Sequence, residues 1–231
     1  MLATDVHCHL LPGLDHGSRN RAESTIMAKA LARLGVERVH VTPHQFRWDI
    51  DLQPDEVREH TATLQSYFTS TGIGLQLEAG AEHYYGERLF DAVERGEELL
   101  TWTSPVAAGE PTERILVELP ARDPVIGTAR LVARLGEREI RPVMAHPERI
   151  QAVQNDPQRA VRWIDEGWQL QLDLMSLAGT YGRPVRRVAR WLLAEGHYAC
   201  AGSDLHRPSQ LRDLERAHVA FRDLAPLETD A

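Results

Sequence analysis

Two histidines separated by one residue stand near the N-terminus, in the segment Asp5-Val6-His7-Cys8-His9. The apolar start of the chain followed by this alternation predicts a strand. Alternate side chains of a strand share a face, so His7 and His9 should lie together while Cys8 points to the other face. Two imidazoles at this spacing can bind one metal ion. Taken alone, the pair is equally compatible with two unrelated strand histidines.

Further histidines and acids recur along the chain, most of them at or just after a segment that is predicted to be a strand. Besides His7 and His9 they are His16, His44, Glu82, Glu118, His146, Asp204 and His206. Singly, each has an ordinary explanation, such as an exposed loop position for His16 or a surface acid for Glu82. Together they exceed the needs of one four-coordinate ion, and so many charges would repel one another without metal. The set predicts two or three ions bridged by carboxylates.

The elements that must position these residues alternate between strands and helices. After the first strand, β-rich segments occupy residues 36–41, 74–79, 115–117, 141–145, 168–172 and 197–201. Helical periodicity and end signals predict helices over residues 21–34, 54–70, 87–95, 124–135, 157–167, 184–195 and 209–221. Seven strands alternating with helices indicate a parallel α/β architecture.

The positions of the polar residues distinguish two kinds of parallel α/β fold. In a barrel, the carboxyl ends of the strands meet at one mouth, whereas in a doubly wound sheet they spread along an edge. No Gly-rich phosphate loop or dinucleotide fingerprint follows the first strand. We therefore predict a single-domain barrel of about seven strands over residues 1–224, with a polar tail at 225–231. The Pro- and Gly-rich segment 101–113 is a candidate flap.

Composition limits the class of protein. The chain has 231 residues, of which 42% are hydrophobic and 26% charged, enough for one globular domain with a sizeable core. Its net charge of -8 argues against a nucleic-acid partner. The two cysteines, Cys8 and Cys200, form no spacing pattern, which suggests a reducing compartment. Without a basic leader or a long apolar run, we predict a cytoplasmic protein that does not insert into a membrane.

Four motifs resemble the polymerase-and-histidinol-phosphatase (PHP) superfamily. They are the segment from Asp5 to Asp15, Thr42-Pro43-His44, Ala145-His146-Pro147-Glu148-Arg149 and Ser203-Asp204-Leu205-His206. Within the superfamily, the chain is most similar to the manganese-dependent tyrosine phosphatases of bacterial capsule and exopolysaccharide operons, the CpsB/CapC/YwqE type. This resemblance covers nearly the whole chain in order. It implies a distorted (β/α)7 barrel, similar to a TIM barrel, with three metal ions at its mouth.

The resemblance also implies which residues bind each ion. The three sets share members and are His7, His9 and Asp204 with Glu82; Glu82 and Glu118 with His146; and His44 and His206 with His16. At the place of His16 the tyrosine phosphatases usually have the second Asp of Asp-Asp-Gly. A histidine removes one negative charge and adds a softer ligand, so Mn²⁺ is expected, with Zn²⁺ or Fe as alternatives. Asp173 replaces an Asn of the family and is expected to line the site or support it.

Metals and arginines together predict phosphoryl chemistry. Bridging metals lower the pKa of bound water, and the hydroxide would attack phosphorus in line without a phospho-enzyme. The planar guanidinium matches phosphate oxygens, and two arginines lie close to predicted ligands: Arg149 three residues after His146, and Arg207 directly after His206. The second arginine of the family lies a few residues farther along. Neither cysteine has an arginine at the spacing that a cysteine phosphatase requires.

The substrate is less determined than the reaction. The aromatic residues Phe46, Trp48, Tyr84 and Tyr85 follow two of the predicted ligands and either flank an aryl phosphate or pack loops onto the rim. The resemblance favours phosphotyrosine on a polysaccharide-assembly tyrosine kinase. Alternatives are a small-molecule phosphatase of the histidinol-phosphate type and a metal-bound regulator without turnover. A binuclear amidohydrolase is disfavoured, because the one lysine, Lys29, lies in a predicted helix rather than in a strand.

Overall fold

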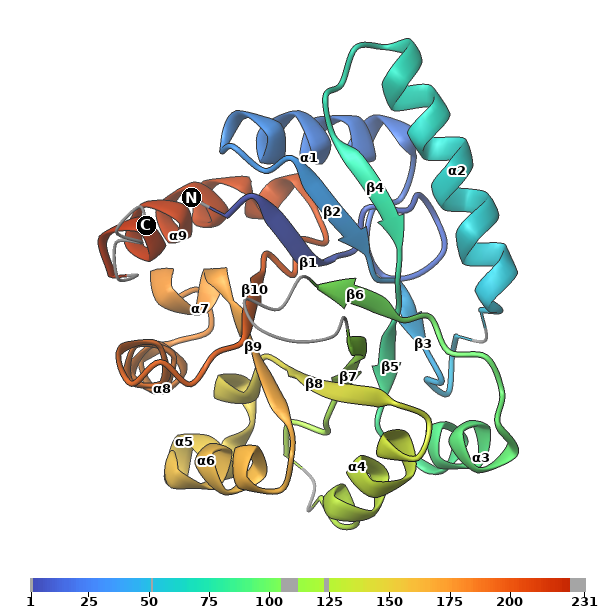
Figure 1. Ribbon diagram of the computed structural model, residues 1–231. Coiled ribbons are helices and arrows are strands. Elements are labelled where there is room, and N and C mark those ends of the chain that lie inside the picture. Colours follow the sequence, from blue (N-terminus) through green and yellow to red (C-terminus); the bar gives the residue numbers. More distant parts are fainter. Residues whose placement is uncertain (1, 51, 105–111, 123–124, 225–231) are drawn as a thin grey trace.

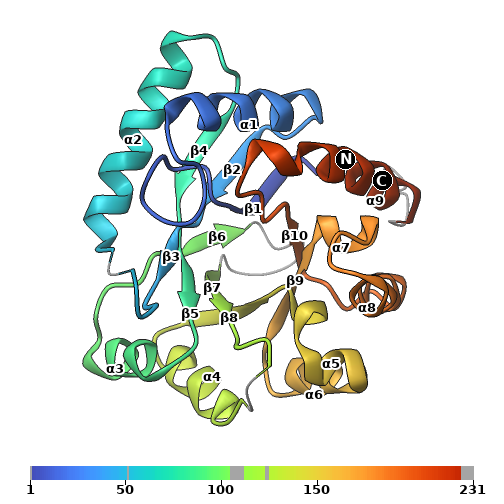
Figure 2. The same ribbon diagram turned by 180° about the vertical axis from the view of Figure 1, so that it is seen from behind.

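Two parallel sheets form the centre of the protein in a computed structural model that describes residues 2–50, 52–104, 112–122 and 125–224. The smaller sheet has the order β1 (Thr4–Cys8), β2 (Arg38–Val41), β4 (Gln76–Ala79). The larger sheet has the order β10 (Cys200–Gly202), β9 (Gln169–Asp173), β8 (Ile140–Ala145), β7 (Thr112–Glu118), β5 (Glu82–Tyr84), β3 (His44–Gln45). Figures 1 and 2 show that these strands form a ring with helices on its outside.

The two sheets join into one distorted barrel. β2 and β4 each continue, after two residues, into β3 and β5, so each pair fills one strand position but belongs to both sheets. On the other side of the ring, β1 meets β10: Asp204 N donates to His7 O over 2.8 Å, and His9 N donates to Leu205 O over 3.1 Å. Counted in this way, the parallel barrel has seven strand positions, which confirms the predicted (β/α)7 architecture.

The helices cover the barrel and begin and end at recognisable signals. They are α1 (Arg21–Arg33), α2 (Pro54–Ser70), α3 (Glu87–Arg95), α4 (Thr128–Gly136), α5 (Gln151–Asn155), α6 (Gln158–Asp165), α7 (Leu174–Ala178), α8 (Arg183–Ala194) and α9 (Leu211–Leu224). The Asn20 side chain caps α1 by accepting from Glu23 N, Pro54 is the first residue of α2, and the left-handed Gly96 ends α3. Among the described residues, no helix has the length and apolar character needed to cross a membrane.

The inside of the barrel is filled partly by a strand that the sequence analysis did not predict. β6 (Trp102–Ser104) pairs antiparallel with the start of β7 and lies across the middle of the ring in Figure 1. Its Trp102 is 6% exposed and packs in a small apolar cluster with Leu116, Val143 and Ala145. The barrel is therefore a packed core below its mouth, and polar chemistry is confined to the carboxyl ends of the strands.

Several predicted boundaries differ from the structure. The strand predicted at 115–117 is longer because its first residues pair with β6, and the helix predicted from Pro124 begins at Thr128. The short helices α5 and α7 were not predicted. In the candidate flap, residues 102–104 form β6, while 105–111 lie outside the described residues, as do Pro124 and the tail 225–231.

The contact between β1 and β10 leaves no room for a side chain at Gly202. A Cβ atom there would lie 2.5 Å from His7 Cβ and 2.8 Å from His7 N, so β10 would have to move away from β1. We expect Gly202→Ala to lower the free energy of unfolding by about 1–3 kcal/mol, the usual effect of overpacking. Urea denaturation measures this change.

Gly74→Ala is the matched control for that measurement. A Cβ atom at Gly74 would meet no atom within 4 Å. Its unfolding free energy should stay within about 0.5 kcal/mol of the parent protein. If Gly202→Ala is as stable as Gly74→Ala, then β10 can move away from β1 without a loss of stability, and the prediction is wrong.

Candidate metal centre

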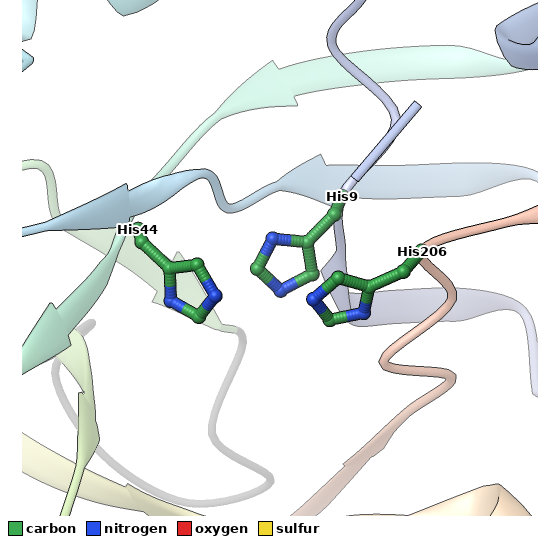
Figure 3. Close-up of side chains that lie close together, drawn as sticks. All are labelled: His9, His44 and His206. Atoms are coloured by element: carbon green, nitrogen blue, oxygen red, sulfur yellow. The ribbon is translucent and has the colours of Figure 1, made fainter. Parts of the chain in front are cut away.

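Eight of the nine predicted ligands meet at the barrel mouth. Their donor atoms form four overlapping groups, within each of which all atoms lie within 4.8 Å of one another. The groups are His7, His9 and Asp204; His7, Glu82 and His146; His44, Glu82 and Glu118; and His9, His44 and His206. Figure 3 shows the last group, with three imidazoles from three separate segments turned toward one another.

Each of these eight predicted ligands lies at the carboxyl end of one of the seven strand positions, where β3 and β5 count as the ends of β2 and β4. His7 lies on β1 and His9 one residue beyond it, while His44 and Glu82 begin β3 and β5 and are direct neighbours in the ladder. Glu118 ends β7, His146 follows β8, and the pair Asp204 and His206 follows β10. The short breaks before β3 and β5 allow two strands to turn inward and present His44 and Glu82 to the mouth.

Glu82 lies at the centre of the cluster and is 1% exposed. Its Oε2 atom lies 2.9 Å from His44 Nδ1 and 3.4 Å from both His7 Nε2 and His9 Nε2. Its other oxygen, Oε1, lies 3.1 Å from His146 Nε2. One carboxylate thus contacts members of all four groups, which is the geometry required of a bridging ligand.

Asp204, which follows β10, is a second carboxylate that faces His7 and His9, as Glu82 does. Its Oδ1 atom lies 3.2 Å from His7 Nε2 and 3.3 Å from His9 Nε2. Asp204 and His146 have φ angles of 49° and 34°, a region that residues other than glycine rarely adopt. Such backbone conformations are concentrated at functional sites, where the surrounding structure holds them.

The charges at the mouth shift the pKa values of the ligands in opposite directions. Burial by itself lowers the pKa of His7, but the carboxylates of Glu82 and Asp204 outweigh burial and raise it to about 9. Burial and the charge of Glu82 raise the pKa of Glu118 to about 8. Burial and the Arg149 guanidinium lower the pKa of His146 to about 4. Strongly divided pKa values within one cluster are typical of a functional site.

The unpaired polar atoms of the cluster are suited to bind metal ions. The buried polar atoms that make no hydrogen bond of acceptable geometry in the described part of the chain include Glu82 Oε2, Asp204 Oδ1, His44 Nδ1 and Glu118 Oε2. All four belong to predicted ligands and point into the cluster. Buried polar atoms without hydrogen bonds are costly, and a divalent cation would satisfy them together. Imidazole and carboxylate donors suit Mn²⁺, Fe²⁺ and Zn²⁺.

Two buried side chains orient the ligands, and the sequence analysis did not recognise this role for either. Gln171 Oε1 lies 3.1 Å from His7 Nδ1 and accepts from His146 N over 3.2 Å. Asp15 Oδ2 lies 2.6 Å from His9 Nδ1 and accepts from His44 N over 3.1 Å. Hydrogen bonds to the second nitrogen of a ligating histidine set its tautomer and its direction. For Asp15, the signal was its place beside His16 in the family's Asp-Asp-Gly motif.

His16 belongs to none of the four groups, although its ring meets the His44 ring edge to face with the centroids 5.9 Å apart. Its side chain is 52% exposed and pairs with Asp49, with His16 Nε2 3.1 Å from Asp49 Oδ2. In the four groups, His9 takes the place beside His44 and His206 that the prediction assigned to His16. At the turn, the Gly17 amide donates to Asp15 Oδ1 over 2.8 Å, and the other oxygen of that carboxylate faces His9 and His44.

The predicted second set is also divided differently. The sequence placed Glu118 and His146 together with Glu82. In the structure, Glu118 groups with His44, and His146 groups with His7, while Glu82 belongs to both groups.

The two predicted arginines have different surroundings. Arg149 NH1 donates to Asp204 and lies 3.5 Å from Asp173 Oδ2, and its guanidinium stacks 4.6 Å from the centre of the Tyr181 ring. Arg207 instead turns toward α1, where its NH1 lies 3.5 Å from Glu23 Oε2. Arg149 therefore lies at the mouth, whereas among the described residues the Arg207 guanidinium pairs with Glu23 and not with a predicted ligand.

Neighbouring acids hold the Arg149 segment in place. Glu148 is fully buried, accepts from Asp173 N over 3.0 Å and from Tyr198 OH over 2.9 Å, and so ties the turn after β8 to the end of β9. Asp173 caps α7 by accepting from Met175 N over 2.8 Å, so the structure gives it the supporting part that was expected. Cys8 is fully buried in the apolar core behind β1, as the alternation predicted.

The contrast between Asp15 and His16 gives a direct test of the ligand set. We expect Asp15→Ala to weaken binding of Mn²⁺ by about 10- to 100-fold, the usual effect of removing the partner that orients a ligand. His16→Ala should bind Mn²⁺ like the parent protein, because its ring lies outside the cluster. Titration calorimetry with metal-free protein measures both. Weaker binding by His16→Ala with no change in Asp15→Ala would restore the original assignment.

Comparison with known proteins identifies the same family as the sequence motifs do. The family of capsular polysaccharide synthesis proteins CpsB/CapC matches residues 3–217. The chain is 30% identical over 203 residues to the tyrosine-protein phosphatase YwqE of Bacillus subtilis (strain 168), covering 87% of this chain and 76% of that protein. It is 23% identical over 207 residues to the tyrosine-protein phosphatase CpsB of Streptococcus pneumoniae, covering 87% and 82%.

Solved structures agree with these sequence matches. A chain from the crystal structures of YwqE and CpsB, described as unique metal-dependent tyrosine phosphatases, matches with a TM-score of 0.82 and 27% identity over 97% of this chain and 88% of that one. A phosphotriesterase homology protein from Escherichia coli, 14% identical with a TM-score of 0.52 over 91% of this chain and 84% of its own, shares the fold alone. The predicted family is confirmed: the chain belongs to the CpsB/CapC family of capsular polysaccharide synthesis.

Proposed function

We propose that this protein is a metal-dependent protein-tyrosine phosphatase. The observation that carries the proposal is the cluster around Glu82, where four ligand groups share members and leave buried carboxylate oxygens without hydrogen bonds. The relatives YwqE and CpsB are tyrosine-protein phosphatases by name, and their structures are described as metal-dependent. A site of this composition on the same fold supports the same chemistry.

We propose two to three divalent ions, with Mn²⁺ as the native metal. The residues that would hold them are His7, His9, His44, Glu82, Glu118, His146, Asp204 and His206. When bound, the ions would supply an activated water as nucleophile and withdraw charge from the phosphoryl oxygens. Zn²⁺ and Fe²⁺ remain alternatives because of the five imidazoles in the four groups. The part predicted for His16 is tested by the His16→Ala variant.

Arg149 is proposed to bind the phosphoryl group. Its guanidinium offers several N–H donors in one plane, which match phosphate oxygens. Asp204, Asp173 and the Tyr181 ring hold it beside the cluster, so its direction is set before substrate arrives. Donors fixed in advance stabilise developing charge without reorganisation, and the protein itself would contribute to catalysis mainly in this way.

The proposed substrate is a phosphotyrosine protein, a bacterial polysaccharide-assembly tyrosine kinase. Support comes from the family description and from the names of the relatives, which combine capsular polysaccharide synthesis with tyrosine phosphatase activity. A small-molecule phosphatase with a histidinol-phosphate-like substrate would use the same cluster. A metal-bound regulator without turnover is disfavoured, because eight of the nine predicted ligands meet in the cluster. The cytoplasmic location stays a prediction.

Metal removal tests the proposal as a whole. After chelation, we expect hydrolysis of a tyrosine-phosphorylated peptide to stop, and we expect added Mn²⁺ to restore it. Metal per chain is measured in parallel, with small phosphomonoesters as competing substrates. Restored hydrolysis of small phosphates but not of the peptide would favour the small-molecule phosphatase. Bound metal without any hydrolysis would contradict the enzyme and favour the regulator.

Replacement of Arg149 tests its role in the reaction. Arg149→Met keeps much of the volume of the side chain but removes the donors, and we expect kcat/KM for the peptide to fall about 100- to 1,000-fold, as for other fixed donors. Arg134→Met is the control, since Arg134 lies on α4 and pairs with Glu137. Metal content should stay unchanged in both. Wild-type turnover in Arg149→Met would exclude the proposed role.

A further inference from the structure

A second arginine reaches the mouth from the loop that follows β3. The side chain of Arg47 is only 16% exposed, and its NH1 atom lies 3.4 Å from His44 Nε2 and 3.7 Å from Glu118 Oε2. Arg149 contacts the cluster through Asp204, on the side of β10. Two guanidiniums from different segments therefore border the same set of ligands. The sequence analysis did not identify Arg47, because it belongs to none of the recognised motifs.

The surrounding structure holds this loop in position. Phe46, directly before Arg47, has a φ of 63°, and its ring packs 5.8 Å from the ring of the buried His83. Arg88 NH1 donates to the carbonyl oxygen of Arg47 over 2.6 Å. A left-handed backbone at a bulky residue persists only where packing compensates for it. These contacts position Arg47 at the mouth rather than in solvent.

Two aromatic rings accompany Arg47 at the rim. Trp48 is 73% exposed, and its ring meets the ring of Tyr84 edge to face at 5.7 Å and 88°. The guanidinium carbon of Arg47 lies 4.7 Å from the centre of the Trp48 ring and 5.9 Å from that of Tyr84. The exposed Trp48 ring thus lies beside Arg47, and Tyr84 adjoins it, so the aromatic surface and the guanidinium form one patch at the rim.

The other two aromatics that the sequence singled out are used inside the protein. Phe46 packs on His83, and Tyr85 is 7% exposed and donates from its hydroxyl to Ile126 O. The two possibilities predicted for these residues are therefore divided: Phe46 and Tyr85 pack inside the protein, whereas Trp48 and Tyr84 meet each other at the rim.

We propose that Arg47, Trp48 and Tyr84 form a subsite for an aryl phosphate. Arg47 binds phosphoryl oxygens from the side of Glu118 and His44, while the two rings contact the aryl group. This inference rests on the proposed phosphatase function and deepens it, because it explains why an aryl phosphate would be preferred over an alkyl phosphate. It also assigns to Arg47 the phosphate-binding role that the sequence analysis predicted for Arg207.

The chemistry of the side chains supports this division of roles. A guanidinium can bind phosphate through two parallel N–H donors. Arg47 Nε–H is buried without a hydrogen bond of acceptable geometry among the described residues, and it faces Asp49 Oδ1 at 3.4 Å. Aromatic faces bind another aromatic ring in offset or edge-to-face arrangements. An alkyl phosphate would bind the Arg47 guanidinium but would gain little from the two aromatic rings.

Binding of two phosphonates to the Mn²⁺-loaded protein tests the subsite without turnover. Phenylphosphonate carries both the charged group and the ring, whereas methylphosphonate carries the charged group alone. We expect Arg47→Met to weaken both ligands about tenfold or more, the effect of losing a charge-assisted hydrogen bond. Trp48→Ala should weaken phenylphosphonate roughly three- to tenfold and leave methylphosphonate unchanged. Calorimetry gives the dissociation constants.

Arg207→Met is the matched control, because it removes the same group from the arginine that the sequence favoured. It should bind both phosphonates like the parent protein, since Arg207 pairs with Glu23. Arg47→Lys, which keeps the charge but loses the planar fork, should weaken both ligands less than Arg47→Met and serves if the latter does not fold. Metal content is measured for every variant.

Several outcomes would overturn the subsite. They are parental binding by Arg47→Met with normal metal content, loss of binding in Arg207→Met, loss of metal rather than of phosphonate affinity in Arg47→Met, or no phosphonate binding by the parent protein. If the parent protein binds phenylphosphonate as expected but does not hydrolyse a phosphotyrosine peptide, the subsite stands and the proposed function fails. The two conclusions are thus tested separately.

Discussion

The convergence of buried carboxylates and imidazoles on Glu82 is the constraint on which the rest of the structure depends. Groups that carry or accept charge are expensive to bury unless opposite charges or a metal ion satisfy them. Here one carboxylate with 1% exposure lies within 3.4 Å of nitrogen atoms from four histidines. The strands that bring these side chains together must therefore be placed accurately at their carboxyl ends.

Two features of the barrel provide this accuracy. The interruptions between β2 and β3 and between β4 and β5 allow two strands to change sheets and turn His44 and Glu82 into the mouth. On the opposite side, Gly202 lets β10 approach β1 so closely that Asp204 and His206 reach the ligands of β1. Below the mouth, Trp102 of β6 fills the barrel and separates the polar site from the opposite end.

A second layer of buried polar residues sets the directions of the ligands. Asp15 holds His9, Gln171 holds His7, and Glu148 fixes the segment that carries Arg149. None of these contacts lies within a helix or along a ladder, so no periodicity reveals them. They show that the motifs contain two kinds of residue, those that face the mouth and those that orient their neighbours.

The sequence by itself determined the order of strands and helices, the barrel and the family, because periodicity, end signals and motifs are local properties of the chain. It also determined which residue types stand at the strand ends, and eight of the nine proposed ligands meet there. Only the tertiary structure decided that the Asp15 carboxylate, not the His16 ring, faces both His9 and His44, and that the Arg47 guanidinium, not that of Arg207, lies beside Glu118. The direction of a loop side chain depends on partners far away in the chain: Arg207 pairs with Glu23, 184 residues earlier, and Arg47 reaches Glu118.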